Sequence, residues 1–272
     1  MFLFIPLFFA EKINDYSLLW STFLAFVAFS FVASSIYIIN DYFDREADRN
    51  HPLKRNRPLV SGKITITQAV IILIVLLLGA ILITTFLPNS FAVIITVYVI
   101  INLFYSVKGK EIAILDVNII AVGFLLRVLA GGEVTGIHIT NWLILLTYLL
   151  ALLLALGKRR TEYWFSQENG EKTRKSLNAY NLEFINAAMI FTAGIAVVSY
   201  IMYTNSPQVI QRIGNQNIYL TSILVVFGVM RYLQLSMVYN RTESPTQVIL
   251  TDTIIQIVLL IWIGAFGYVL YF

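Results

Sequence analysis

The sequence predicts an all-α integral membrane protein, a bundle of about nine transmembrane helices whose first helix is short at its N-terminus. Three observations support this. The 272 residues are 58% hydrophobic and only 12% charged, with a mean hydropathy of +0.79, whereas a soluble domain has about 25% charged residues. The apolar residues form long unbroken runs, and not the apolar–polar alternation of a transmembrane barrel. Basic residues gather in alternate loops, as in multi-pass membrane proteins.

Eight apolar runs approach the roughly 20 residues needed to cross a bilayer. They cover residues 18–39, 65–87, 90–106, 112–131, 141–158, 183–204, 217–239 and 250–271. The stretch 2–10 is too short to cross alone, and we interpret it as the end of a first helix. Met1 leads directly into apolar residues, so no signal peptide is expected. The whole chain, 1–272, is expected to form one transmembrane domain.

Lysine and arginine are distributed unevenly over the loops. The loops 40–64, 106–111, 158–182 and 240–249 hold 15 of the 19 basic residues, and the loops on the other side hold two. Positive residues mark cytoplasmic loops. We therefore expect a multi-pass protein of the inner or cell membrane, with its active site facing the cytoplasm.

Several kinds of chemistry are excluded by composition. The chain has no cysteine, which excludes thiolate catalysis, zinc-thiolate sites, iron–sulfur clusters and disulfides. His51 and His138 lie far apart in the sequence, which argues against a His-rich metal site. We interpret the net charge of +4 as topology bias rather than as a sign of nucleic-acid binding.

Three aspartates close the second helix of the predicted bundle. Asp41, Asp44 and Asp48 stand at i, i+3 and i+7, which places three carboxylates on one helix face. Such carboxylates repel unless a cation neutralises them, and Mg²⁺ takes hard oxygen ligands together with substrate phosphates. The alternative is a solvated helix end in which Arg45 and Arg49 pair with the aspartates.

Basic residues follow these aspartates directly. Lys54, Arg55 and Arg57 lie within ten residues of Asp48. Carboxylates that bind a metal beside such a cluster predict a Mg²⁺–pyrophosphate site, because cations stabilise the charge of a leaving group. The alternative is that these residues only set the membrane topology.

A second polar region begins at residue 105. Lys108 and Lys110 can reach phosphate oxygens as point charges. Asp116 sits one turn inside an apolar span and needs a partner there. We interpret it as a contact to substrate or metal, with a structural hydrogen bond between helices as the alternative.

Two arginines lie inside apolar spans and must face the bundle interior. Arg127 is either a contact to a lipid phosphate or a member of a buried ion pair. For Arg231 we favour a structural role, with Asp252 as one possible partner. Lys158 and Arg159 close another span, where they would also serve as simple positive-inside anchors.

Residues 40–48 resemble the NDxxDxxxD signature of the UbiA superfamily of intramembrane prenyltransferases, whose helix count is nine. The longer run NDYFDREADRNHPLKRNRPLVSG resembles the decaprenyl-phosphate phosphoribosyltransferase branch of that superfamily. Residues 105–116, 123–132 and 157–180 resemble the same branch. The family's usual Arg-Pro-x-Gln-Trp-x-Lys-Asn segment ahead of the first helix has no counterpart, so we expect the chain to be truncated or its start to be assigned late.

The resemblance implies a Mg²⁺-dependent transfer of 5-phosphoribose from phosphoribosyl pyrophosphate to a polyprenyl (decaprenyl-type) phosphate, with release of pyrophosphate. It implies catalytic roles for Asp41, Asp44 and Asp116, and metal binding by Asp41, Asp44 and Asp48. The implied substrate-binding residues are Asn40, Lys54, Arg55, Arg57, Tyr105, Lys108, Arg127, Lys158 and Arg159. The expected partners are the two substrates and the bilayer, without nucleic acid, and a homo-oligomer is allowed.

Two other functions fit parts of the pattern. A UbiA-type prenyltransferase would move a prenyl group from a prenyl diphosphate to an aromatic or other acceptor with the same residues. A transporter would explain charges inside the membrane. We disfavour transport, because the sequence shows no inverted repeat and the aspartates lie at a helix end.

Overall fold

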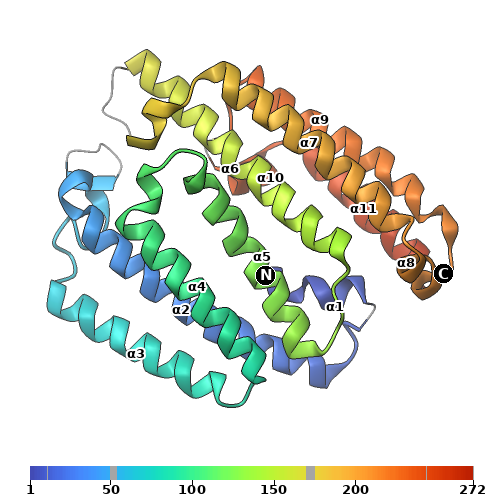
Figure 1. The fold of residues 1–272 in the computed structure, drawn as a ribbon, viewed down its shortest axis with the longest axis horizontal. Helices are drawn as coiled ribbons and strands as arrows, with labels where there is room; N and C mark the ends of the chain where they lie inside the picture. The colour runs from blue at the N-terminus through green and yellow to red at the C-terminus, as the bar shows by residue number, and fades with distance from the viewer. Residues whose placement is uncertain (11, 50–53, 170–174, 243, 272) are drawn as a thin grey trace. The chain divides into compact units, whose positions relative to one another are not determined.

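The computed structural model describes residues 1–10, 12–49, 54–169, 175–242 and 244–271 (Figure 1). All regular secondary structure in these ranges is helical, which confirms the predicted class. The chain divides into two compact units. The single domain expected over residues 1–272 stays a prediction.

The first unit comprises Met1–Lys110 and Leu126–His138 and is organised around one long helix, α2. Its described helices are η1 (Phe2–Phe4), α1 (Ile5–Phe9), α2 (Tyr16–Arg49), η2 (Lys54–Asn56), α3 (Ile66–Thr84), α4 (Asn89–Val107) and the second half of α5 (Leu115–Thr135). α2 packs against α3 and α4, as Figure 1 shows, and also against η1 and η2. α2 is therefore the helix around which the first unit packs.

Local sequence signals fix where the helices of this unit begin. The Asp15 carboxylate accepts hydrogen bonds from the backbone N–H groups of Ser17 and Leu18, at 3.0 and 3.2 Å, and so caps α2. Thr65 and Gln68 form a reciprocal capping box at the start of α3. The 34 residues of α2 extend over about 51 Å, more than the roughly 30 Å of a bilayer's hydrocarbon core. The helix therefore has polar turns to spare at its C-terminal end.

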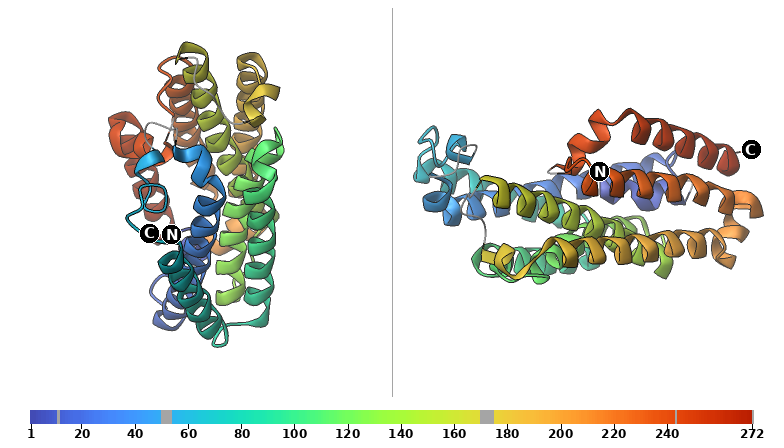
Figure 2. Two further views of the ribbon diagram at one scale, coloured as in Figure 1. Left: turned by 90° about the vertical axis from the view of Figure 1, so that its left-hand side faces the viewer. Right: turned by 90° about the horizontal axis from the view of Figure 1, so that it is seen from above.

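The second unit comprises Glu111–Leu125 and Ile139–Phe272. Its described helices are the first half of α5, α6 (Asn141–Asn169), η4 (Lys175–Ala179), α7 (Leu182–Thr204), α8 (Pro207–Ile213), η5 (Gln216–Thr221), α9 (Ser222–Met237), α10 (Pro245–Thr251) and α11 (Thr253–Tyr271). α7 packs against both α6 and α9, and α11 packs along α9, which is visible in the right-hand view of Figure 2.

The core of the second unit is closely packed. Ile185 and Met189 of α7 are fully buried in a cluster that includes residues of α6 and α9. At Gly157 of α6, a Cβ atom would lie 2.1 Å from the hydroxyl oxygen of Tyr232 on α9. Only glycine fits at such an approach, so this position fixes how closely α6 and α9 pack.

Seven helical stretches of the described chain are long and apolar enough to cross a membrane: α2, α3, α4, α5, α6, α7 and the run from η5 through α9. The expected span 250–271 is interrupted, because Asp252 adopts an extended backbone between α10 and α11. Its apolar part forms the shorter helix Thr253–Val269. The expected short first helix corresponds to η1 and α1.

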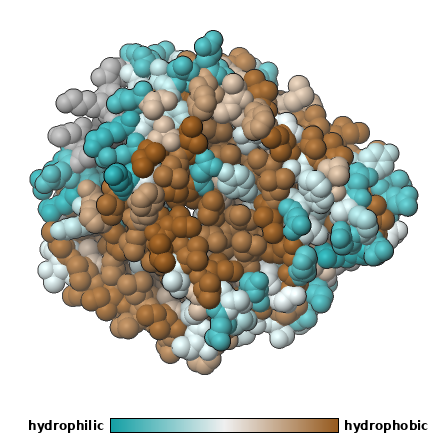
Figure 3. Space-filling view, in the orientation of Figure 1, coloured by the Kyte–Doolittle hydropathy of each residue, from teal (hydrophilic) through white to brown (hydrophobic). Residues whose placement is uncertain are grey.

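Large apolar side chains remain exposed on the helices that are expected to face lipid. On α3, Val75, Leu78 and Leu82 are each more than 60% exposed. Figure 3 shows apolar residues at the lower left, where α3 lies in Figure 1, and hydrophilic residues along the left edge, near the end of α2. This distribution agrees with a helix that crosses a bilayer, where lipid replaces protein as the apolar environment.

Candidate active site

The three aspartates at the end of α2 are neutralised by cations from outside the helix. One guanidinium nitrogen of Arg57, Nη1, donates to Asp41 Oδ1 at 2.8 Å and to Asp48 Oδ2 at 2.7 Å. Asp44 forms an ion pair with Lys110. The oxygens of Asp41 and Asp48 therefore converge on one cationic centre.

These ion pairs are partly shielded from solvent. The side chains of Asp41 and Asp44 are 27% and 26% exposed, and that of Asp48 is 6% exposed. The described partners are Arg57 and Lys110, and not Arg45 and Arg49 as in the solvated alternative. The face is therefore a partly buried charge cluster in which Asp41 and Asp44 remain in contact with solvent.

One oxygen at this cluster has no hydrogen-bond partner among the described residues. Asn40 donates from Nδ2 to Asp44 Oδ2 at 3.1 Å, but no described group donates to its buried Oδ1. The Nε of Arg45, five residues further along α2, is also buried without a partner in the part of the chain that the structure describes. Buried polar atoms without partners cost free energy, because the group has lost its contact with water. Both atoms lie on α2 at the aspartates, where a polar ligand or a water molecule would lower that cost.

A second carboxylate–cation cluster lies in the second unit, around Asp116. Its side chain is 0% exposed and accepts hydrogen bonds from Arg159 Nε at 2.6 Å, Tyr180 Oη at 2.9 Å and Ser176 Oγ at 3.3 Å. Arg159 is 2% exposed and also pairs with Glu162. A buried charge is tolerated only when it is paired and hydrogen-bonded, and this cluster meets that condition.

Tyr180 links this cluster to a strained turn. Its hydroxyl accepts a hydrogen bond of 2.6 Å from the backbone N–H of Ile114, whose φ of +68° is unusual for a β-branched residue. Burial raises the pKa of Tyr180 above its ordinary value of 10, outweighing the opposing effect of the Ile114 hydrogen bond. Tyr180 therefore stays protonated and donates to Asp116, so it holds the turn before α5 in place.

The two arginines inside spans have different surroundings. Arg127 Nη2 donates to the Tyr98 hydroxyl at 2.8 Å, and its guanidinium lies 5.2 and 4.9 Å from the centres of the Phe29 and Tyr98 rings. Arg231 Nη2 lies 2.7 Å from Asp252 Oδ2 in an ion pair. The pairing of Arg231 with Asp252 is thereby confirmed, and its structural role stays a prediction.

Comparison with known proteins identifies the family. The profile of the UbiA prenyltransferase family matches residues 1–158. The decaprenyl-phosphate phosphoribosyltransferase of Mycolicibacterium smegmatis is 32% identical over 92% of this chain and 80% of its own. The protein of the same name from Corynebacterium glutamicum is 30% identical over 88% of this chain and 73% of its own. This chain belongs to the UbiA prenyltransferase family.

A solved structure shows that the fold is also that of the UbiA family. The structure of a UbiA homologue from Archaeoglobus fulgidus, bound to DMAPP and Mg²⁺, superposes with a TM-score of 0.71 at 19% identity. The match covers 99% of this chain and 94% of the homologue. The predicted UbiA-like fold is confirmed, and the chain is a multi-pass membrane transferase of the UbiA family.

The donor types at the end of α2 suit Mg²⁺, although their present arrangement does not form a metal site. Carboxylate oxygens are the hard ligands that Mg²⁺ prefers, and Asn40 Oδ1 is a buried oxygen without a partner among the described residues. A cationic nitrogen of Arg57 already stands where the oxygens of two aspartates converge. Among the described residues, no three acidic or histidine side chains are arranged around one metal position. Binding by all three aspartates would therefore require Arg57 and Lys110 to release them.

Some of the predicted basic residues contact the aspartates, and others are exposed away from them. Arg57 meets the aspartates, whereas Arg55 is exposed on η2, and the side chain of Lys54 and all of His51 fall outside the described residues. In the second polar region Lys110 contacts the cluster, while Lys108 is exposed. The two lysines flank Gly109, so spacing in the sequence could not show which one turns toward Asp44.

The remaining predicted residues differ in burial. Tyr105 on α4 and Lys158 on α6 are both half-buried. Ser176 and Tyr180, which contact Asp116, lie 60 and 64 residues beyond it, and no spacing signal in the sequence selects them as its partners. Arg160 is buried and donates to Asn186 and to other groups of the second unit, which supports a structural role.

Proposed function

We propose that this protein transfers 5-phosphoribose from phosphoribosyl pyrophosphate to a polyprenyl phosphate and releases pyrophosphate. The observation that carries the proposal is the 32% identity to a decaprenyl-phosphate phosphoribosyltransferase over 92% of the chain. The half-buried carboxylate–cation cluster at the end of α2 supports it, because this chemistry suits a substrate with a pyrophosphate group.

The reaction breaks one bond and makes one. The bond from the anomeric carbon of ribose to the pyrophosphate oxygen breaks, and pyrophosphate leaves with the electron pair. A phosphate oxygen of the lipid forms the new bond to the same carbon. Because the attacking phosphate is already an anion, no strong general base is needed, which agrees with a chain that has two histidines and no cysteine.

The donor's pyrophosphate is proposed to bind at the aspartates of α2. Asp41, Asp44 and Asp48 would hold Mg²⁺, which when bound neutralises negative charge on the leaving group. Arg57 and Lys110 are within reach of the same position, since both now pair with those aspartates. When a pyrophosphate arrives, they can exchange a carboxylate oxygen for a phosphate oxygen without losing a charged partner.

The Asp116 cluster is assigned a positioning role in this proposal. Asp116 already accepts three hydrogen bonds and is fully buried. Its neighbour Arg159 donates its described hydrogen bonds to Asp116 and Glu162. A direct catalytic role for Asp116 and direct substrate contacts for Lys158 and Arg159 stay predictions. We further propose that the basic loops, and with them the active site, face the cytoplasm.

A transfer assay tests the proposed function. Membranes that contain the protein are incubated with labelled phosphoribosyl pyrophosphate, Mg²⁺ and a polyprenyl phosphate, and the label that enters the lipid fraction is counted. We expect lipid-soluble label that depends on both the lipid and Mg²⁺. A parallel incubation supplies a prenyl diphosphate with an aromatic acceptor. Product from this second incubation alone would show that the chain is a prenyltransferase in the narrower sense.

A further inference from the structure

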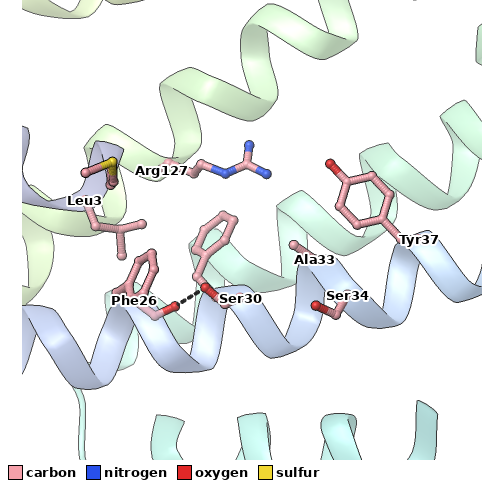
Figure 4. A pocket seen from close by; sticks show the side chains of 9 residues that line it. Leu3, Phe26, Ser30, Ala33, Ser34, Tyr37 and Arg127 are labelled. Carbon is pink, nitrogen blue, oxygen red and sulfur yellow. Dashed lines mark hydrogen bonds between the residues drawn. The ribbon is translucent and has the colours of Figure 1, made fainter. Parts of the chain in front are cut away.

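A pocket of about 250 Å³ lies in the first unit beside the middle of α2. Figure 4 shows α2 contributing one wall and Arg127 of α5 reaching over it. The lining residues are Met1, Leu3, Phe26, Phe29, Ser30, Ala33, Ser34, Tyr37 and Arg127. Among the side chains of this described lining, one is basic, that of Arg127, and none is acidic. We call it the Arg127 pocket.

The cation of the Arg127 pocket is held in place by its surroundings. The Tyr98 hydroxyl accepts a hydrogen bond from it, and the Phe29 and Tyr98 rings lie within 5.2 Å of the guanidinium carbon. Aromatic faces attract cations and lower the cost of keeping one away from water. In Figure 4 the guanidinium points across the pocket toward the Tyr37 hydroxyl. The polar groups of the pocket thus face one another above an apolar floor.

That floor also depends on close packing. At Gly131 of α5, a Cβ atom would lie 2.1 Å from the backbone oxygen of Leu3, so η1 sits directly on the helix that carries Arg127. Leu3 is 2% exposed. The close contact between Gly131 and the Leu3 backbone therefore holds the apolar side chain of Leu3 and the helix of Arg127 together. The pocket is a built feature and not a gap between loosely packed helices.

The Arg127 pocket shares a helix face with the aspartate cluster. Ser34, Asp41 and Asp48 recur every seven residues along α2, and so do Ser30, Tyr37 and Asp44. Seven residues make almost two helical turns, so the members of each series lie one above another, about 10 Å apart. One face of α2 therefore carries an apolar pocket with a cation and, farther along, the proposed pyrophosphate site.

The chemistry of the lining selects between the two proposed substrates. Phosphoribosyl pyrophosphate is polar throughout and would have to place its sugar against Leu3, Phe26 and Phe29. An amphiphile with one phosphate and an apolar chain matches a single arginine above aromatic side chains. The volume is below the 300–1,000 Å³ of typical ligand pockets. It suits a headgroup and the start of a chain, and the rest of the lipid would remain in the bilayer.

We propose that the Arg127 pocket binds the phosphate group and the first isoprene units of the acceptor lipid. This inference rests on the proposed function. Arg127 pairs with the phosphate, Phe26 and Phe29 contact the isoprene units, and the exposed residues Ser34 and Tyr37 mark the side from which the lipid enters. The two substrates would then bind at different positions along α2. The donor binds at the aspartates, and the acceptor binds nearer the middle of the helix.

Binding of each substrate alone tests this assignment. Purified protein in detergent is titrated with farnesyl phosphate, farnesol, inorganic phosphate and phosphoribosyl pyrophosphate by calorimetry. We expect farnesyl phosphate to bind at least about tenfold more tightly than farnesol or inorganic phosphate, because only it satisfies both the cation and the apolar wall. Arg127→Gln should weaken farnesyl phosphate binding at least about tenfold and leave phosphoribosyl pyrophosphate binding unchanged.

A second variant keeps the test decisive if Arg127→Gln does not fold. Ser34→Phe fills the pocket, retains the arginine and should weaken farnesyl phosphate to a similar extent. Thr96→Phe, which adds the same ring to an exposed position of α4, serves as the matched control and should bind normally. Equal affinity in Ser34→Phe and Thr96→Phe would overturn the proposal.

Other outcomes separate this inference from the proposed function. No binding of farnesyl phosphate to the unmodified protein, or equally tight binding of inorganic phosphate, would also overturn the pocket assignment. The first would leave the pocket without a lipid, and the second would make it a site for free phosphate. If farnesyl phosphate binds through Arg127 but phosphoribosyl pyrophosphate neither binds nor transfers its sugar, then the acceptor site stands and the proposed donor is wrong.

Discussion

The two carboxylate–cation clusters of this protein contain similar groups but differ in their access to water. At the end of α2, Asp41 and Asp44 keep about a quarter of their side-chain surface exposed. In the second unit, Asp116 and Arg159 are 0% and 2% exposed. Both clusters pair acidic with basic side chains, so their residue types alone do not distinguish them.

The difference in exposure determines what each cluster can do. A partly exposed ion pair contributes little to stability, and either member can exchange its partner for a ligand. A fully buried pair cannot release one member without leaving the other charged and unsolvated, which costs several kcal/mol. The first cluster is therefore suited to binding, and the second to holding the structure around it.

The largest expected effect is on the stability of the buried cluster. Asp116→Asn would remove the fully buried carboxylate and leave Arg159 with Glu162 as its described counter-charge. It should lower the free energy of unfolding by about 3 kcal/mol, the lower end of the cost of breaking a buried pair. Glu111→Gln is the matched control, because its pair with Lys175 is exposed, and should change stability by less than about 0.5 kcal/mol. Denaturant unfolding in detergent measures both. Equal stability of the two variants would remove the distinction between the clusters.

The next effect is on the activity of the exposed cluster. Asp41→Asn should reduce phosphoribosyl transfer by roughly 10²–10³-fold, as expected when charge stabilisation is lost at a reacting group. Stability should hardly change, because Arg57 keeps its bond to Asp48. Glu46→Gln, on an exposed position of the same helix, should retain full activity. An Asp41→Asn enzyme with normal turnover would contradict the assignment of the donor site.

A smaller effect is expected at Tyr180. Tyr180→Phe removes the donor to Asp116 and the acceptor for the Ile114 N–H, and should cost about 1–3 kcal/mol of stability. Because burial raises the pKa of this phenol, it stays protonated, and the cost should be the same at pH 6 and pH 8. Tyr219→Phe is an exposed control. A cost confined to one of the two pH values would show that the contact titrates.

The arrangement of helices was largely predictable from the sequence. Long apolar runs leave few alternatives, and the spacing of Asp41, Asp44 and Asp48 gave their common face, since both features are local. The break at Asp252 was not predicted, because the apolar pattern continues on both sides of it. An ion pair with Arg231, and a hydrogen bond that its carboxylate accepts from the Ile255 backbone N–H, hold that residue outside the helix.

The partners of the site residues were harder to predict. Asp44 meets Lys110, 66 residues further along, and Asp116 meets Arg159 after 43 residues. Such contacts depend on how helices pack, and single-sequence patterns report only local structure. The basic run after α2 indicated that cations gather there, but of Arg55 and Arg57 only folding could select the one that turns toward the aspartates.

The ion pair between Arg231 and Asp252 has a consequence for how the chain enters the membrane during synthesis. Arg231 leaves the ribosome 21 residues before its partner. Until Asp252 follows, α9 carries an arginine without this counter-charge, which is costly inside a bilayer. We therefore expect α9 to remain beside the insertion machinery, or in contact with earlier helices, until the start of α11 arrives. Pairing of the charges and release of these two helices into the bilayer would then be a single event.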